Sequence, residues 1–163
     1  MANKILYAPE TALSFRDSGG DAVLTLINLG FGAGQISARY DRGAGSKPGL
    51  AEVRGIMQWQ SAPIAGEVAE IYISQSDGTN ADGVVGTTAA ALTAGQISNL
   101  GNPVCIVKAQ TTATATDNIH SEKVLIWGRY ISVGVVNRSA GDNLQNTSNA
   151  SEVIITFYSL EIQ

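Results

Sequence analysis

The sequence has one cysteine and one histidine, Cys105 and His120, among its 163 residues. A single cysteine excludes a disulfide within the chain and a thiolate metal cage, and a single histidine excludes a metal site with two imidazole ligands. Cys105 lies in the apolar run 104–107, which predicts a buried, unreactive thiol rather than a nucleophile paired with His120. His120 lies in a polar stretch, which indicates a solvated loop residue. We therefore predict that the protein is not an enzyme and has no catalytic residue, metal site or cofactor.

Charged residues are also scarce. Asp, Glu, Lys and Arg make up 15% of the chain, and the net charge is −4, whereas soluble domains carry roughly one charged residue in four. Binding to nucleic acid needs clustered Lys and Arg, so we expect no nucleic-acid partner. No apolar run approaches the roughly 20 residues that span a bilayer, and the first residues lack the apolar core of a signal peptide. We expect synthesis in a cytoplasm and no membrane partner.

Three glycine-rich loops resemble ligand-binding motifs but lack decisive residues. The loop 30–34 has glutamine where a dinucleotide-binding loop needs its third glycine, and 43–48 lacks the Gly-Lys pair of a phosphate-binding loop. The loop 77–83 is acidic, but alignment with a calcium-binding loop places the first ligand position on Gly78 and the bidentate carboxylate on Ala89. We interpret all three as turns, and a cation at 77–83 stays an open alternative.

Alternation of apolar and polar residues is the main pattern that the sequence does contain. In 52–60 one face carries Val53, Met57 and Trp59 while the other carries charged and amide side chains, which predicts a half-exposed strand. The run 67–75 alternates in the same way after a Pro/Gly turn. Two such runs around a turn indicate antiparallel neighbours or a connection between two sheets.

Three further segments, 22–29, 124–136 and 152–162, are apolar on both faces. Such strands suit the interior of a sandwich or a surface that another subunit covers. Weaker strand patterns lie at 13–16, 35–40 and 104–108. About eight strands separated by turns predict an all-β fold, an antiparallel β-sandwich of the jelly-roll type formed by residues 1–163 as a single domain.

Helix signals are confined to one segment, 87–100, where four helix-favouring residues at 89–92 precede Gly95. A short helix, a single turn or a covering loop all fit this segment. The polar stretches 76–86, 111–122 and 139–151 are predicted to be loops.

The N-terminal segment 1–9 has two interpretations. It is either an arm that pairs with the sheet edge of a neighbouring subunit or the first strand of the domain itself.

From about residue 52 onward the chain resembles small virion proteins of tailed phages, of the capsid decoration or cement type. The resemblance rests on three strand-and-turn blocks: the strand with Trp59 followed by 61–66 and 68–76, the segment 92–101, and 129–141, where a strand ending in Val-Val-Asn enters a Ser/Gly turn. It implies a jelly-roll-like sandwich, assembly in symmetric copies (often a homotrimer), location in the virion and attachment to the major capsid protein. It implies no catalytic or ligand-binding residues.

The expected function is therefore cementing of a bacteriophage head, in which copies bury apolar and tyrosine-rich patches on each other and on the capsid shell. Tyr40, Trp59, Tyr72 and Trp127 are the candidate contact residues, and each fits the core equally well. One alternative is a carbohydrate-binding or adhesin-like sandwich on a tail or baseplate, with Trp59 or Trp127 in a groove. A second is a small hydrolase that uses His120, which the lack of other catalytic motifs disfavours.

Overall fold

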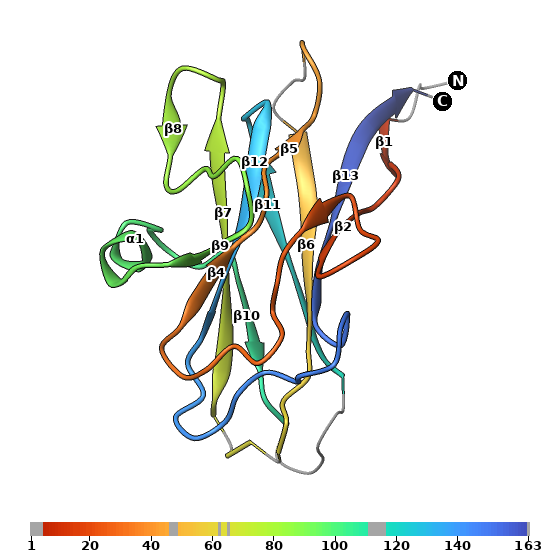
Figure 1. Cartoon of the computed structure of the whole chain (residues 1–163). Helices are drawn as coiled ribbons and strands as arrows, with labels where there is room; N and C mark the ends of the chain where they lie inside the picture. The colour runs from red at the N-terminus through yellow and green to blue at the C-terminus, as the bar shows by residue number, and fades with distance from the viewer. Residues whose placement is uncertain (1–4, 46–48, 62, 65, 111–116, 163) are drawn as a thin grey trace.

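The structure is a computed structural model, and it describes residues 5–45, 49–61, 63–64, 66–110 and 117–162. Two β-sheets pack face to face (Figure 1). The first sheet has the order β11 (Asn118–Ile126), β6 (Gly49–Met57), β13 (Glu152–Ile162), β2 (Leu13–Arg16), β3 (Ala22–Val23), with β1 (Ile5–Pro9) also beside β13. The second has the order β10 (Cys105–Lys108), β7 (Val68–Ser76), β12 (Tyr130–Asn137), β4 (Gly34–Ile36), β9 (Ala90–Leu92), and β5 (Tyr40–Asp41) and β8 (Ala81–Asp82) pair with β12 and β7.

Eight of these strands have the connectivity of a jelly roll. In chain order they are β2, β4, β6, β7, β10, β11, β12 and β13. Numbered one to eight, they give the order 6-3-8-1 in the first sheet and 5-4-7-2 in the second. This arrangement of two four-stranded sheets is the double Greek key of jelly rolls. The predicted all-β sandwich is confirmed.

The core between the sheets is built from alternate residues of each strand. On β6, Ala51, Val53 and Met57 point inward and are fully buried, and Trp59 follows them at 1% exposure. The same alternation buries Val153, Ile155 and Phe157 on β13. Because each fully buried aliphatic side chain contributes about 1.5–3 kcal/mol, these inward rows hold the two layers together.

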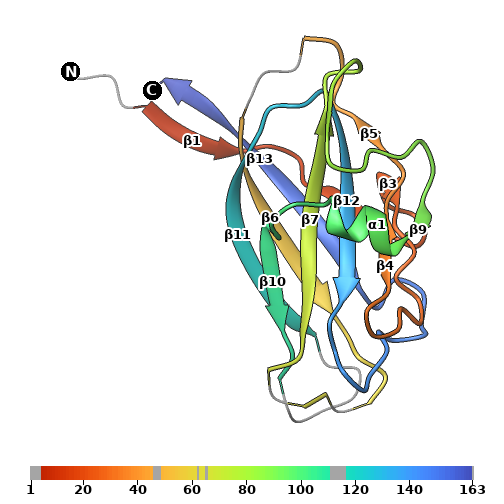
Figure 2. The same cartoon turned by 90° about the vertical axis from the view of Figure 1, so that its left-hand side faces the viewer.

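The outer face of the second sheet is covered by the chain itself. Between β7 and β10 the chain leaves the sandwich and returns across β7, β12 and β4, carrying β8, β9 and the short helix α1 (Ala94–Ser98) (Figure 2). Ile36, Tyr72 and Val136 of the sheet pack there with Leu92 and Leu100 of this covering segment. The apolar outer residues of β7 and β12 are therefore buried within one chain.

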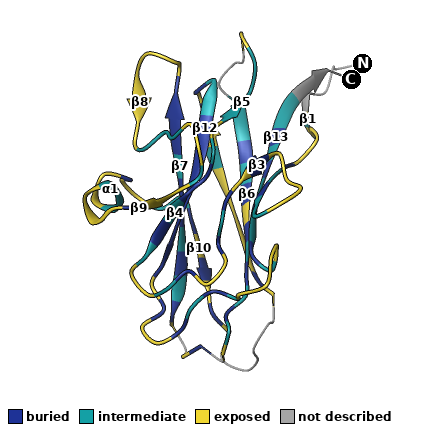
Figure 3. Ribbon diagram, in the orientation of Figure 1, coloured by how far each residue is buried: buried dark blue, intermediate teal, exposed yellow. Residues whose placement is uncertain are grey.

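The helix α1 falls inside the segment predicted to hold one. Thr93 caps it, because its hydroxyl accepts a hydrogen bond from the backbone N–H of Gln96 while the Gln96 side chain accepts one from the Thr93 N–H. The helix and β8 form the exposed outside of the covering segment (Figure 3).

Several predicted elements are wrong in their bounds. The run 124–136 is two strands in different sheets, β11 and β12, separated by a turn at 127–129. β11 begins at Asn118, so the loop predicted over 111–122 is a strand in its last five residues, and His120 lies on a strand (residues 111–116 lie outside the described part of the chain). β11 ends its sheet and its side chains are mostly exposed, so no buried face imposes an apolar alternation.

The segment 22–29 is a strand only at Ala22–Val23. Leu24, Leu26 and Leu29 are nevertheless buried, because an irregular chain inserts them beneath the sheet. Likewise, 35–40 divides into β4 and β5.

The N-terminal strand β1 pairs with β13 of the same chain, with Ile5 opposite Ile162 and Pro9 opposite Tyr158. Both chain ends lie together at one end of the sandwich (Figure 1). The first four residues of the segment considered as an arm lie outside the described part of the chain.

Candidate docking surface

The outward side of the first sheet, which we call the outer face, has no covering segment among the described residues. Its side chains form four rows across β11, β6 and β13, set by the strand registers. An apolar row, Leu125–Leu50–Tyr158, lies at one end, and Ile119–Ile56 with Glu152 lies at the other. Leu125 is 66% exposed and Ile119 is 47% exposed. Large apolar side chains left in solvent at strand positions mark a candidate contact surface.

Charged residues occupy the two middle rows of the outer face. Lys123 is opposite Glu52, and Arg54 lies between Ser121 and Ile154. The Tyr158 hydroxyl donates a hydrogen bond of 2.8 Å to Glu52 Oε2, and the Lys123 ammonium lies 6.0 Å from the centre of the Tyr158 ring. The hydrogen bond to Glu52 raises the pKa of Tyr158. These contacts fix the tyrosine and the acid in place on the outer face.

The free edge of β11 borders the outer face. The other strands that end the two sheet paths are short: β3 has two residues, β9 has three and β10 has four, whereas β11 has nine. Short edges offer few unpaired backbone groups, and long ones invite another strand. β10 and β11 lie on the same side of the sandwich (Figure 2).

A groove of about 600 Å³ lies between β10 and β11. Lys108 and Gln110 line one wall, and Ile119, His120 and Glu122 line the other. His120 Nε2 is 2.9 Å from Glu122 Oε1, and both side chains are about half exposed. The inward positions of β11 thus hold an exposed polar pair instead of core residues.

Cys105 lies at the floor of this groove. Its thiol donates a hydrogen bond of 3.6 Å to the backbone oxygen of His120, and the imidazole of His120 is not the acceptor. Burial raises the pKa of Cys105 to about 11, so the thiol is protonated at neutral pH. The structure places Cys105 and His120 close together without a contact that would activate the sulfur.

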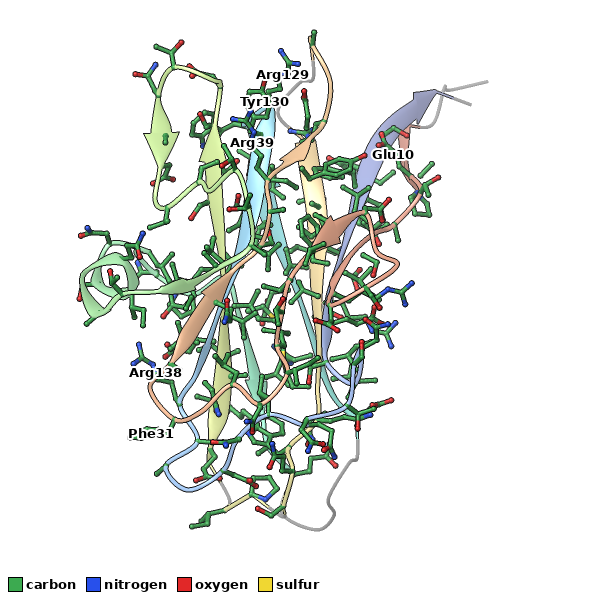
Figure 4. The ribbon with its side chains drawn as sticks, viewed as in Figure 1. Glu10, Phe31, Arg39, Arg129, Tyr130 and Arg138 are labelled. Atoms are coloured by element: carbon green, nitrogen blue, oxygen red, sulfur yellow. The ribbon has the colours of Figure 1, made fainter. Side chains whose placement is uncertain are left out.

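The loops at one end of the sandwich are tied together by hydrogen bonds. Asn28 Oδ1 accepts from Gln60 Nε2 (2.6 Å) and from Asn143 Nδ2 (3.1 Å), and Asn137 Nδ2 donates to the backbone oxygens of Leu29 and Asp142. Phe31, 61% exposed, projects from this end (Figure 4). It is one of the exposed apolar side chains that lie apart from the outer face, as is Ile64 at 70%.

A cluster of cations surrounds Tyr130 at the opposite end (Figure 4). The guanidinium groups of Arg39 and Arg129 lie 4.5 Å and 4.8 Å from the centre of its ring. Arg129 also forms two hydrogen bonds of 2.7 Å with the Asp41 carboxylate. These hydrogen bonds lower the pKa of Asp41 from 3.8 to about 2.

The four candidate contact residues separate in the structure. Trp59 is in the core, Tyr72 is buried beneath the covering segment, and Tyr40 is half-buried against Phe15, with ring centres 6.5 Å apart. Trp127 alone among them is exposed, at 38%. Sequence reasoning did not single out Leu125 or Ile119 as contact residues, because Leu125 lay in a run predicted to be apolar on both faces and Ile119 in a segment predicted to be a loop.

The loop 77–83 forms its own hydrogen-bonded turn. Asp77 Oδ1 accepts from the backbone N–H groups of Thr79 and Asn80, both at 2.7 Å, and Oδ2 accepts from Asn80 Nδ2. These hydrogen bonds lower the pKa of Asp77. Among the described residues, no group of three or more His, Cys, Asp or Glu side chains is placed to hold a metal ion.

Comparisons with protein-family models, with curated proteins and with solved structures found no match. Within the described part of the chain, no helix has the length and apolar character needed to cross a membrane.

Proposed function

We propose that this protein is a virion structural protein, a capsid decoration or cement protein that stabilises a phage head by binding the major capsid protein. One observation carries the proposal: among the described residues, the chain covers the outer face of its second sheet with its own segment and leaves the outer face of its first sheet bare, with Leu125 and Ile119 exposed on it. A jelly roll with one covered and one uncovered face is suited to lie flat on another protein.

The size of the outer face indicates how such docking would work. The three strands β11, β6 and β13, about 4.8 Å apart and about 30 Å long, give a face of roughly 430 Å². Stable interfaces bury about 800 Å² on each partner, so one copy alone would bind weakly. Several linked copies would hold by multivalency, because dissociation then requires all contacts to break together. Self-association is therefore part of the proposal. The resemblance predicts a trimer, and the dimer inferred below from the edge of β11 is the alternative to it.

The chemistry of the outer face fits a protein partner. Its charged side chains are two bases, Arg54 and Lys123, and the acid Glu52 in the middle rows, with a second acid, Glu152, in one end row. Balanced charges give orientation, while the apolar rows give the favourable burial. We expect capsid binding that weakens only modestly with added salt.

The test is binding of the purified protein to undecorated capsids of the matching phage. We expect saturation at a fixed number of copies per capsomer, visible as symmetric density by electron microscopy. Arg54→Glu, which reverses a charge in the centre of the outer face, is expected to abolish binding. The matched control Ala94→Glu places a carboxylate on the exposed surface of α1, over the covered sheet, and should bind normally. Absence of saturable binding by the unmodified protein would refute the proposal.

A second function, carbohydrate binding, is favoured by the exposure of Trp127 beside the end of β11. Trp59, the other tryptophan considered for it, is buried and offers no surface for sugar stacking. Quenching or shifting of Trp127 fluorescence by glycans, lost in Trp127→Ala, would support this function over cementing.

A further inference from the structure

Within the described part of the chain, β11 pairs with β6 on one side only, and the orientation of the backbone groups on its other edge follows from its neighbours. The Glu10 N–H donates to the Phe157 oxygen at 2.8 Å, so Phe157 points its backbone groups away from β6. Backbone direction alternates along a strand, and therefore Thr156 and Tyr158 bond to β6 and, one strand further, Ala51 and Val53 bond to β11.

The partners of these β6 residues on β11 are Val124 and Glu122. By the same alternation, the odd-numbered residues of β11 direct their N–H and C=O groups to the edge away from β6. These residues are Ile119, Ser121, Lys123 and Leu125. The side chains of these four residues point to the outer face. A strand added to this edge would therefore extend the outer face directly.

We propose that β11 of two copies of this chain pair antiparallel along these edges, with Val124 on the two-fold axis. The half of β11 near His120 faces β10 across the groove, where Cys105 approaches the His120 oxygen. The half from Glu122 to Ile126 is clear of this groove except for the side chain of Glu122. The contact is centred in this clear half.

Charge and overlap together select the register within that half, because an axis at Leu125 or Ile126 would leave only three residues or one residue of β11 paired with the partner strand. An axis at Glu122 sets two carboxylates opposite each other, and an axis at Lys123 sets two ammonium groups opposite each other, which is unfavourable. An axis at Val124 sets Val124 opposite Val124 of the partner. Lys123 of each copy then lies opposite Leu125 of the other, and the Leu125 side chains of the two copies are diagonal neighbours. This register has no like charges opposite one another and covers the most exposed residue of the outer face.

We expect a second copy of this chain at the β11 edge because one outer face alone is smaller than a stable interface. Pairing at β11 joins two outer faces on one side of a continuous sheet and doubles their area to roughly 860 Å², slightly above the roughly 800 Å² per partner of stable interfaces. This gain for docking rests on the proposed function, but the pairing itself is testable without capsids. An isologous contact closes at two copies, so we expect a dimer.

Cysteine cross-linking tests the register. Directly opposite residues at a non-hydrogen-bonded position have Cα atoms about 4.5 Å apart, within disulfide range. Val124→Cys is expected to form a cross-linked dimer under mild oxidation at least about tenfold faster than Ser121→Cys, which lies off the axis. Native Cys105 is buried, so the unmodified protein is the blank. Equal or reversed rates would overturn the proposed contact.

Sedimentation measures the association itself. The unmodified protein should be a dimer at micromolar concentration, and Leu125→Lys should raise the dissociation constant at least about tenfold by placing like charges across the axis. Phe31→Lys, at the exposed loop end, should leave it unchanged. A monomer, a trimer, or a dimer indifferent to Leu125→Lys would overturn the inference. A dimer that does not bind capsids would refute the cement function but would still support the contact between the two β11 strands.

Discussion

Trp59 and Leu144 form an isolated antiparallel bridge between the loop that follows β6 and the loop that precedes β13. The Gln60 N–H donates to the Asn143 oxygen at 3.0 Å, and the Gln145 N–H donates to the Gln58 oxygen at 2.8 Å. Both bridged side chains are buried. The bridge thus closes one end of the core and fixes Trp59 in it.

Because Trp59 fills the core, we expect Trp59→Ala to lower the free energy of unfolding by about 3–5 kcal/mol. The indole N–H has no hydrogen-bond partner in the structure, so its loss adds no unpaired acceptor to this cost. Urea unfolding measures the change. Trp127→Ala, at a partly exposed position, is the matched control and should cost far less; equal costs would contradict the placement of Trp59.

Gly55 allows the two sheets to approach each other. A Cβ at this position would clash with Ile71 Cδ1 and Val107 Cγ2 of the opposite sheet. We expect Gly55→Ala to destabilise the protein by about 1–3 kcal/mol through overpacking. Gly95→Ala on α1, where a Cβ meets nothing within 4 Å, should instead stabilise slightly, by about 0.5–1 kcal/mol. Thermal unfolding of both variants gives the comparison, and a stabilised Gly55→Ala protein would be inconsistent with this packing.

The Asp41–Arg129 pair predicts a dependence of stability on acid. The pKa of Asp41 is lowered from 3.8 to about 2 in the folded protein. A carboxylate with a depressed folded pKa stabilises the fold above its unfolded pKa, and this contribution is lost as pH falls from about 4 to about 2. In Arg129→Gln the pKa of Asp41, followed by NMR, should return toward 3.8. The variant should also lose less stability than the unmodified protein over that pH range.

Cys105 is expected to resist alkylation in the folded protein. Burial raises the pKa of Cys105 to about 11, so little thiolate forms even at mildly alkaline pH. The residue as a whole is only 1% exposed. Iodoacetamide labelling followed by mass spectrometry should be slow until denaturant is added. Rapid labelling of the folded protein at neutral pH would show that the groove between β10 and β11 exposes the thiol.

The strands with one buried face were predictable from sequence. The alternation around Val53 and Met57 defines β6, and that of Ala69 and Ile71 defines β7, because burial on one side requires apolar residues at every second position. β11 was not predictable in its first half. At an edge open on both faces, residues such as His120 and Glu122 are accommodated in a strand by backbone pairing with β6 alone.

The candidate surface shows the same division. Tyr72 and Leu125 are both large side chains flanked by aliphatic residues, and nothing local distinguishes them. Tyr72 is buried because Leu92 and Leu100, which lie 20 or more residues further along the chain, fold over it. Leu125 is exposed because no such segment covers the first sheet within the described residues.

The amino-acid sequence by itself determined the layered β architecture, since the two-residue period is a local property that any strand with one buried face must have. Tertiary structure alone decided which face is left bare and which edge is left open. Those outcomes depend on contacts between residues far apart in the chain, such as Glu52 with Tyr158 and Tyr72 with Leu100. No local sequence pattern specifies which distant segments come together.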